Sequence, residues 1–115
     1  MTTPKNIKWE QFEVVEMRTG TIIAAEVFTK AKKPAYKLQI DFGPTIGIKK
    51  SSAQITDYYT VESLINQQVV AVVNFPPKQI ADFMSECLVL GAVNSENKVV
   101  LLQPESQVIN GLRIL

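Results

Sequence analysis

Residues 36–42 read Tyr36-Lys37-Leu38-Gln39-Ile40-Asp41-Phe42, so apolar and polar side chains alternate along this segment. Successive side chains of a β-strand point to opposite faces, and the segment therefore predicts a strand with one buried and one wet face. Gly43-Pro44 follows as a turn. Ile46 and Ile48 continue the alternation, which predicts a hairpin partner for this strand.

Further strand segments lie on both sides of this hairpin. They are residues 19–28, 69–75, 88–93 and 99–102. The third strand along the chain is followed by residues 60–65, which predict a short helix with Thr60 as its N-cap. Pro76-Pro77 stops the next strand because proline lacks the N–H group that a ladder needs. This order predicts a mainly β fold, a five-stranded OB-fold barrel with short helices and terminal additions.

The chain has 115 residues, which fits one domain and leaves little room for a second. Trp9-Glu10-Gln11-Phe12 indicates a short helical turn with Trp9 and Phe12 on one side. We therefore expect residues 1–16 to form an N-terminal extension with a short helix. Residues 17–115 would then form the OB-fold domain.

The cysteine content and the hydropathy of the chain indicate the cellular compartment in which we expect the protein. Cys87 is the single cysteine, which excludes an internal disulfide and favours a reducing compartment. The longest apolar runs, such as residues 69–73, are far shorter than the roughly 20 residues that span a bilayer. Residues 1–5 lead into no apolar signal core. We expect a cytoplasmic protein with no membrane insertion.

The net charge is only +1, yet the lysines are unevenly distributed. Between residues 30 and 50 six lysines stand against Asp41 alone. A run of this kind forms either an ordinary solvated face or a basic patch for phosphate groups, and the sequence leaves both interpretations open.

The residue types argue against catalysis. The chain has no histidine, which removes the commonest general base and most zinc sites. Cys87 has no second cysteine to share a metal, and we expect a packed, inert thiol. No glycine-rich phosphate loop is present. We therefore expect a binding module rather than an enzyme, with no cofactor and no metal.

An ordered set of segments resembles the CsaA family, chaperone-like proteins built on the tRNA-binding domain that is also attached to some methionyl-tRNA synthetases. The segments are residues 18–22, 40–43, 47–55, 73–81, 88–91 and 99–104. The resemblance runs from about Phe12 to the C-terminus. It implies an OB-fold barrel that pairs as a symmetric homodimer through its N-terminal helix and C-terminal strands. The implied interface residues are Trp9, Phe12, Ile114 and Leu115.

The resemblance also implies tRNA as a partner. Asn74, Lys78 and Ser85 stand at positions that the family uses for RNA, with Lys49 and Ser51 on the preceding segment. Lysines hold phosphates, and amide and hydroxyl groups read bases or 2′-hydroxyls. The complete predicted RNA-binding set is Lys33, Lys37, Lys49, Lys50, Ser51, Asn74, Lys78 and Ser85. Asp82 and Leu88 depart from the family's pattern, which often has Gly and Met there, and Asp82 would repel phosphate.

A second function of a different class is implied as well. A CsaA-like protein would bind unfolded or pre-secretory polypeptides in protein export, which needs an exposed apolar groove. Its possible lining residues are Phe75, Pro76, Pro77, Ile80 and Phe83, which a packed loop would explain equally well. For Phe75 and Phe83 we favour core packing over stacking. A subunit that only docks on a synthetase or another enzyme is a third interpretation.

Overall fold

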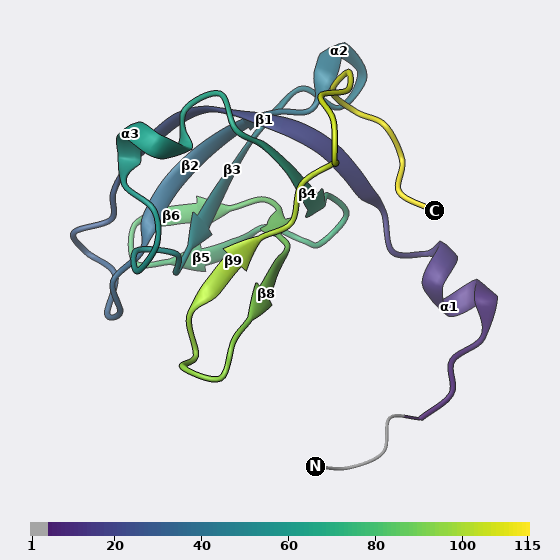
Figure 1. Ribbon diagram of the computed structural model, residues 1–115, viewed down its shortest axis with the longest axis horizontal. Helices are drawn as coiled ribbons and strands as arrows, with labels where there is room; N and C mark the ends of the chain where they lie inside the picture. The colour runs from purple at the N-terminus through teal and green to yellow at the C-terminus, as the bar shows by residue number, and fades with distance from the viewer. Residues whose placement is uncertain (1–4) are drawn as a thin grey trace.

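A computed structural model describes residues 5–115 of the protein (Figure 1). Within this range the chain is mainly β, and its largest sheet is a five-stranded antiparallel sheet that curls into a nearly closed barrel. This confirms the predicted class and strand number. Of the extension expected over residues 1–16, residues 1–4 lie outside the described range. In the part of the chain that is described, no helix is both long enough and apolar enough to cross a membrane.

The five-stranded sheet is organised around its longest strand, β1, which pairs with two neighbours. The strand order is β3-β2-β1-β4-β7. The strands are β1 (Met17–Val27), β2 (Tyr36–Asp41), β3 (Ile48–Ala53), β4 (Gln68–Val72) and β7 (Leu88–Val89). The first part of β1 pairs with β4 and the last part with β2. A register shift between Ile22 and Ala24 marks a β-bulge, which bends a strand.

The two ends of this strand order, β3 and β7, approach each other. The amide of Glu86 donates to the carbonyl of Lys50 at 2.7 Å. The hydroxyl of Ser51 donates to the carbonyl of Cys87 at 2.9 Å. These bonds satisfy polar groups that an open sheet edge would leave exposed, so they close most of the barrel.

The barrel core is filled by the apolar face that the alternation in β2 predicted. Tyr36, Leu38 and Ile40 are buried, while Lys37 and Gln39 between them face outward. The largest fully buried apolar side chains beside them are Ile22, Phe42, Leu64 and Val69. Burial of these side chains supplies the main driving force for the fold.

Three predicted elements differ in the structure, and a fourth is confirmed. Gly43-Pro44 opens a short helix, α2 (Gly43–Ile46), so Ile46 lies in that helix rather than in a strand. The positive φ of Gly43 and the bond from its amide to the Asp41 carboxylate fix this turn. The strand predicted over 69–75 ends at Val72, and the one predicted over 88–93 is split into β7 and β8. The short helix α3 (Val61–Leu64) is confirmed, and its N-cap Thr60 accepts a bond from the amide of Ser63.

Two hairpins and one helix stand on the barrel (Figure 1). The hairpin of β5 (Lys78–Ile80) and β6 (Phe83–Ser85) was not predicted. The hairpin of β8 (Gly91–Val93) and β9 (Val99–Leu101) has its turn at the predicted residues 94–97. Helix α1 (Trp9–Glu13) confirms the predicted helical turn and lies beyond the N-terminal end of β1.

Candidate functional site

The outward face of β2 carries side chains that line up in rows across three strands. The register places Ala24, Gln39 and Lys50 opposite one another on β1, β2 and β3. Glu26, Lys37 and Ser52 form the next row. Residues that are paired across an antiparallel sheet share a face, so both rows belong to one surface.

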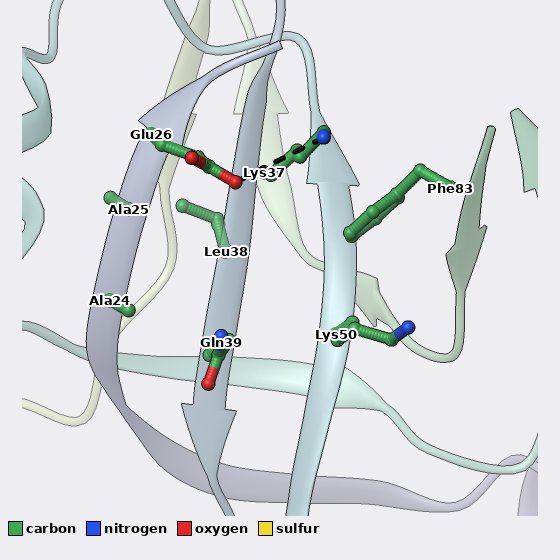
Figure 2. Close-up of a pocket in the computed structure, with 8 residues that line it drawn as sticks. All are labelled: Ala24, Ala25, Glu26, Lys37, Leu38, Gln39, Lys50 and Phe83. Carbon is green, nitrogen blue, oxygen red and sulfur yellow. Dashed lines mark ion pairs between the residues drawn. The ribbon is translucent and has the colours of Figure 1, made fainter. Parts of the chain in front are cut away.

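The β5–β6 hairpin leans over this surface and places an aromatic ring on it. Phe83 meets the ring of Phe28 edge-on at 5.4 Å between centroids. The Nζ atoms of Lys37 and Lys50 each lie 5.4 Å from the centre of the Phe83 ring, and Figure 2 shows the ring between them. A cation at this distance from a ring is attracted by its quadrupole. The hairpin therefore collects two cations around one ring.

A hollow of about 230 Å³ lies between this ring and the strands, and we call it the aromatic hollow. It is lined by Ala24, Ala25, Glu26, Lys37, Leu38, Gln39, Lys50 and Phe83 (Figure 2). Its walls combine an aromatic face, an amide, a carboxylate and two ammonium groups.

A larger hollow of about 650 Å³ is lined mainly by polar residues, and we call it the lysine groove. Lys30, Lys32, Lys33 and Lys78 line it together with Ser52, Gln54 and the first strand of the β5–β6 hairpin. The β1–β2 loop and the hairpin thus bring lysines that lie 45 or more residues apart in sequence to one surface. Such a concentration of positive charge attracts polyanions.

Asp82, the acid that sequence reasoning placed close to the RNA surface, is paired. Its carboxylate accepts a hydrogen bond from Lys30 Nζ at 2.8 Å. This bond lowers the pKa of Asp82, and the same bond raises the pKa of Lys30. The negative charge that would repel phosphate is therefore largely compensated by Lys30.

A third hollow, of about 280 Å³, is the apolar hollow. It is lined by Phe75, Pro76, Lys78, Ser85, Cys87 and Leu88. Cys87, one of these lining residues, is buried, and burial raises the pKa of its thiol to about 11. The thiol is therefore protonated near neutral pH, in agreement with the packed thiol expected from the sequence.

The predicted RNA-binding residues divide into two groups. Lys33 and Lys78 lie in the lysine groove, and Lys37 and Lys50 lie in the aromatic hollow. Ser85 is the cross-strand partner of Lys78, and its hydroxyl accepts a bond from the amide of Ser52. These five residues surround the β5–β6 hairpin and belong to one surface.

The other three lie elsewhere. Lys49 is opposite Ile40, so it points to the other face of β3 from Lys50. Ser51 is 1% exposed, and its hydroxyl donates a hydrogen bond to the Cys87 carbonyl. The Asn74 side chain bonds to Val14 and Glu16, between α1 and β1, and not to the β5–β6 hairpin.

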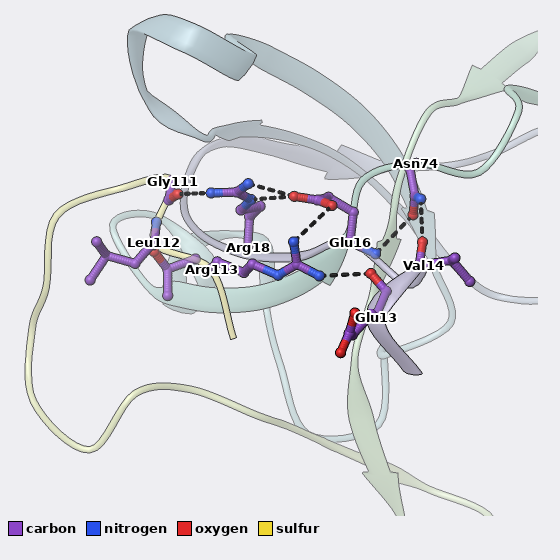
Figure 3. A network of polar contacts seen from close by, with 9 residues as sticks. Glu13, Val14, Glu16, Arg18, Asn74, Gly111, Leu112 and Arg113 are labelled. Atoms are coloured by element: carbon purple, nitrogen blue, oxygen red, sulfur yellow. Dashed lines mark hydrogen bonds and ion pairs between the residues drawn. The ribbon is translucent and has the colours of Figure 1, made fainter. Parts of the chain in front are cut away.

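Asn74 instead joins a network that we call the terminal seam, formed by Glu16, Arg18, Asn74 and Arg113 (Figure 3). The Asn74 amide donates to the Val14 carbonyl at 2.7 Å and accepts from the Glu16 amide at 3.0 Å. Glu16 accepts from Arg18 and pairs with Arg113, and the Arg18 bond lowers the pKa of Glu16. The seam fastens the segment after α1 and the C-terminal segment to β1.

Only three of the five residues expected to bind peptide are exposed. Phe75 is 54% exposed, so the preferred interpretation of core packing is wrong for it, because β4 ends before it. Pro76 and Pro77 are exposed as well, whereas Ile80 and Phe83 are half-buried. Among the residues expected at a dimer interface, Trp9 and Leu115 are 79% and 98% exposed, and Phe12 and Ile114 are half-buried.

Sequence reasoning missed Gln39, Phe28 and Lys30 as site residues. Gln39 could have been found, because it shares the wet face of its strand with Lys37. Lys30 belongs to the lysine run that the sequence showed, but its pairing with Asp82 depends on the tertiary fold. Phe28 reaches the site only because the hairpin folds back onto it.

Fold and surface together define the class of the protein. The barrel presents an aromatic ring between lysines, next to a groove lined by further lysines, and these are the kinds of side chain that nucleic-acid-binding barrels use. Residues 17–113 match the family described as "Putative tRNA binding domain". The chain belongs to this family of tRNA-binding domains.

Similar proteins fall into two groups. Chaperone CsaA from Bacillus anthracis is 51% identical, with a TM-score of 0.91 over 96% of this chain and 100% of that one. A CsaA chaperone protein from Picrophilus torridus is 49% identical, with a TM-score of 0.90 over the same shares. A methionine–tRNA ligase from Chlorobium chlorochromatii is 32% identical over 91% of this chain and 14% of its own length. The chain thus spans about one seventh of that curated relative.

Proposed function

We propose that the protein is a non-catalytic tRNA-binding protein of the CsaA type, whose barrel is an OB-fold used for binding. The observation that carries this is the gathering of Lys33, Lys37, Lys50 and Lys78 around the β5–β6 hairpin of a tRNA-binding domain. Within residues 5–115, Lys33, Lys50 and Lys78 form no ion pair. Their charges are therefore free to hold phosphates.

The mode of binding follows from the two hollows. The lysine groove has a volume of about 650 Å³ and four lysines in its lining, which suits a phosphodiester backbone. Counterions of the backbone are released when lysines take their place. The aromatic hollow beside it suits a group that can stack. Because the net charge is only +1, we expect moderate affinity that depends on this local surface rather than on the whole molecule.

We also propose that the protein forms a homodimer through α1 and the C-terminal segment. Trp9 and Leu115 are large apolar residues that are almost fully exposed in the single chain. Apolar surface of this kind is usually covered by a partner. Light scattering after size-exclusion chromatography should give the mass of two chains. A single-chain mass that persists at high protein concentration would rule the dimer out.

A second candidate function is the binding of unfolded or pre-secretory polypeptides, supported by the chaperone names of the two similar structures. The apolar hollow, with Phe75, Pro76 and Leu88, is the surface that favours it. It lies on the same hairpin as the lysine groove, with Lys78 lining both. Both partners would be met in the cytoplasm. If the hollow holds polypeptide, Phe75→Ser should weaken the binding of a reduced, unfolded client and leave tRNA affinity unchanged.

The experiment that tests the tRNA function is a fluorescence-anisotropy titration of labelled tRNA at several salt concentrations. The wild-type protein should bind, and the logarithm of its affinity should fall linearly with the logarithm of the salt concentration. Replacing Lys33 and Lys78 together by Ala should reduce the slope by about two, one for each lost phosphate contact.

Lys98→Ala is the matched control for this titration. Lys98 lies on the β8–β9 turn, where it pairs with Glu96 and contacts the Tyr58 ring. Its replacement should leave the slope unchanged. Absence of tRNA binding by the wild-type protein at low salt would overturn the proposed function.

A further inference from the structure

The aromatic hollow has the dimensions and walls of a subsite for one planar group. Its volume of about 230 Å³ is below the range of about 300–1,000 Å³ that is typical of pockets for drug-sized ligands. The hollow is therefore too small for stacked neighbours and suits a single ring system. The Phe83 ring contacts Phe28 edge-on and has the ammonium groups of Lys37 and Lys50 beside it. A base that stacks on this ring would take the place of one ammonium group, which would turn to the neighbouring phosphate.

On the β1 side, the hollow is lined by two small residues. The bulge at Ile23 puts Ala24 opposite Gln39 and Ala25 opposite Leu38. Both alanines line the hollow (Figure 2). A larger side chain at position 24, which shares the outward face with Gln39, would fill the space in front of the ring. Bulges are frequent next to binding sites, where they re-aim side chains.

Gln39 supplies a polar group that the fold itself does not use. Its side chain is exposed, and no hydrogen bond to it is found among residues 5–115. An amide presents one acceptor oxygen and two donor hydrogens, which match the adjacent acceptor and donor of an adenine edge. Glu26 lines the same hollow and pairs with Lys37 at 4.0 Å, and its second carboxylate oxygen adds an acceptor for an exocyclic amino group. Uracil has no such amino group to offer.

We propose that the aromatic hollow binds one unpaired adenine of an RNA strand. The base stacks on Phe83, Gln39 reads its edge, and Lys37 and Lys50 hold the flanking phosphates. This inference rests on the proposed RNA-binding function and adds a base preference to it. It makes Gln39 the residue that determines specificity and the lysines the residues that determine affinity.

The test compares binding of the oligonucleotides r(A)8 and r(U)8 by anisotropy. The wild-type protein should prefer r(A)8 by about 5-fold or more, the lower end of what one bidentate base contact provides. Gln39→Ala should abolish the preference and leave the salt slope unchanged. Phe83→Leu should weaken both oligonucleotides by about 5- to 100-fold, because stacking does not depend on sequence.

Gln107→Ala is the matched control, since Gln107 is an exposed glutamine of the C-terminal segment far from the hollow in sequence and outside its lining. It should bind both oligonucleotides as the wild-type protein does. Phe83→Leu is checked for folding by its melting curve. If that variant unfolds, the Gln39 comparison still decides, because Gln39 is exposed and makes no internal bond.

A second measurement separates this inference from the proposed function. In ¹⁵N-labelled protein, adenosine 5′-monophosphate should shift the side-chain amide signals of Gln39, assigned by their loss in Gln39→Ala, more than uridine 5′-monophosphate does. Salt-dependent tRNA binding without base preference and without this shift would overturn the adenine subsite and leave the tRNA function intact. Absence of all RNA binding would overturn the function, and absence of the shift would then overturn the subsite too.

Discussion

The β5–β6 hairpin region and the terminal seam both concentrate charged and amide side chains, but they use them differently. In the seam, Arg18 and Arg113 share Glu16, and the Asn74 amide bonds in both directions. In the hairpin region, Lys37 and Lys50 lie beside the Phe83 ring, and the acids Asp82 and Glu26 pair with Lys30 and Lys37. Lys33, Lys50 and Lys78 form no ion pair within residues 5–115. The difference teaches that polar groups satisfied within the chain fix its shape, whereas unsatisfied groups on a rigid surface are available to a partner.

The largest effect on tRNA binding is expected in the hairpin region, where two adjacent lysines point to opposite faces of β3. Lys50→Glu should weaken tRNA binding by about 10- to 100-fold, because it places a like charge beside phosphate. Lys49→Glu makes the same change in net charge on the opposite face of β3. It should cost less than about 5-fold at 0.15 M salt, because screening confines charge effects to roughly 8 Å. Anisotropy titrations of the two variants check this, and equal losses would show that the two faces do not differ.

The seam can be tested at Asn74. Asn74→Ala removes two hydrogen bonds to the backbone and should lower the free energy of unfolding by about 1–2 kcal/mol. Under conditions where the variant remains folded, its tRNA affinity should stay within about 2-fold of the wild-type value. Urea denaturation and anisotropy measure the two quantities. A variant of unchanged stability that loses tRNA binding would instead assign Asn74 to the RNA, as the family resemblance implies.

The smallest effect is expected at Asp82. Asp82→Asn removes a surface ion pair and releases Lys30 into the lysine groove. Both side chains are exposed, so the stability of the fold should hardly change. The affinity for tRNA should rise by about 2- to 5-fold at low salt, and the gain should disappear near 0.5 M salt. A decrease in affinity would mean that the ion pair positions the hairpin for binding.

The sequence predicted the parts of the fold that depend on local pattern. The alternation at Tyr36 to Phe42 and the N-cap at Thr60 are local signals, and both are confirmed. The β5–β6 hairpin has strands of only three residues and a turn in which Ala81 has a positive φ, so no pattern was long enough to indicate it. Its position over β2 and β3 depends on contacts such as that between Phe28 and Phe83.

The candidate site was predictable in composition but not in arrangement. The lysine run was visible, yet the separation of Lys49 from Lys50 required the register of β3. The roles of Ser51 and Asn74 depend on bonds to residues 36 to 60 positions away, which a single sequence does not reveal.

The bulge in β1 has a consequence for how this chain tolerates a change in length. Ile22 already faces Ile40 and Ala24 already faces Gln39, so Ile23 is the one residue between them without a place in the ladder. A chain that lacked Ile23 would retain all the neighbouring pairs and would lose the local bend. The bend that lets one strand serve both halves of the barrel therefore depends on one extra residue, and deleting Ile23 should straighten β1 at this point.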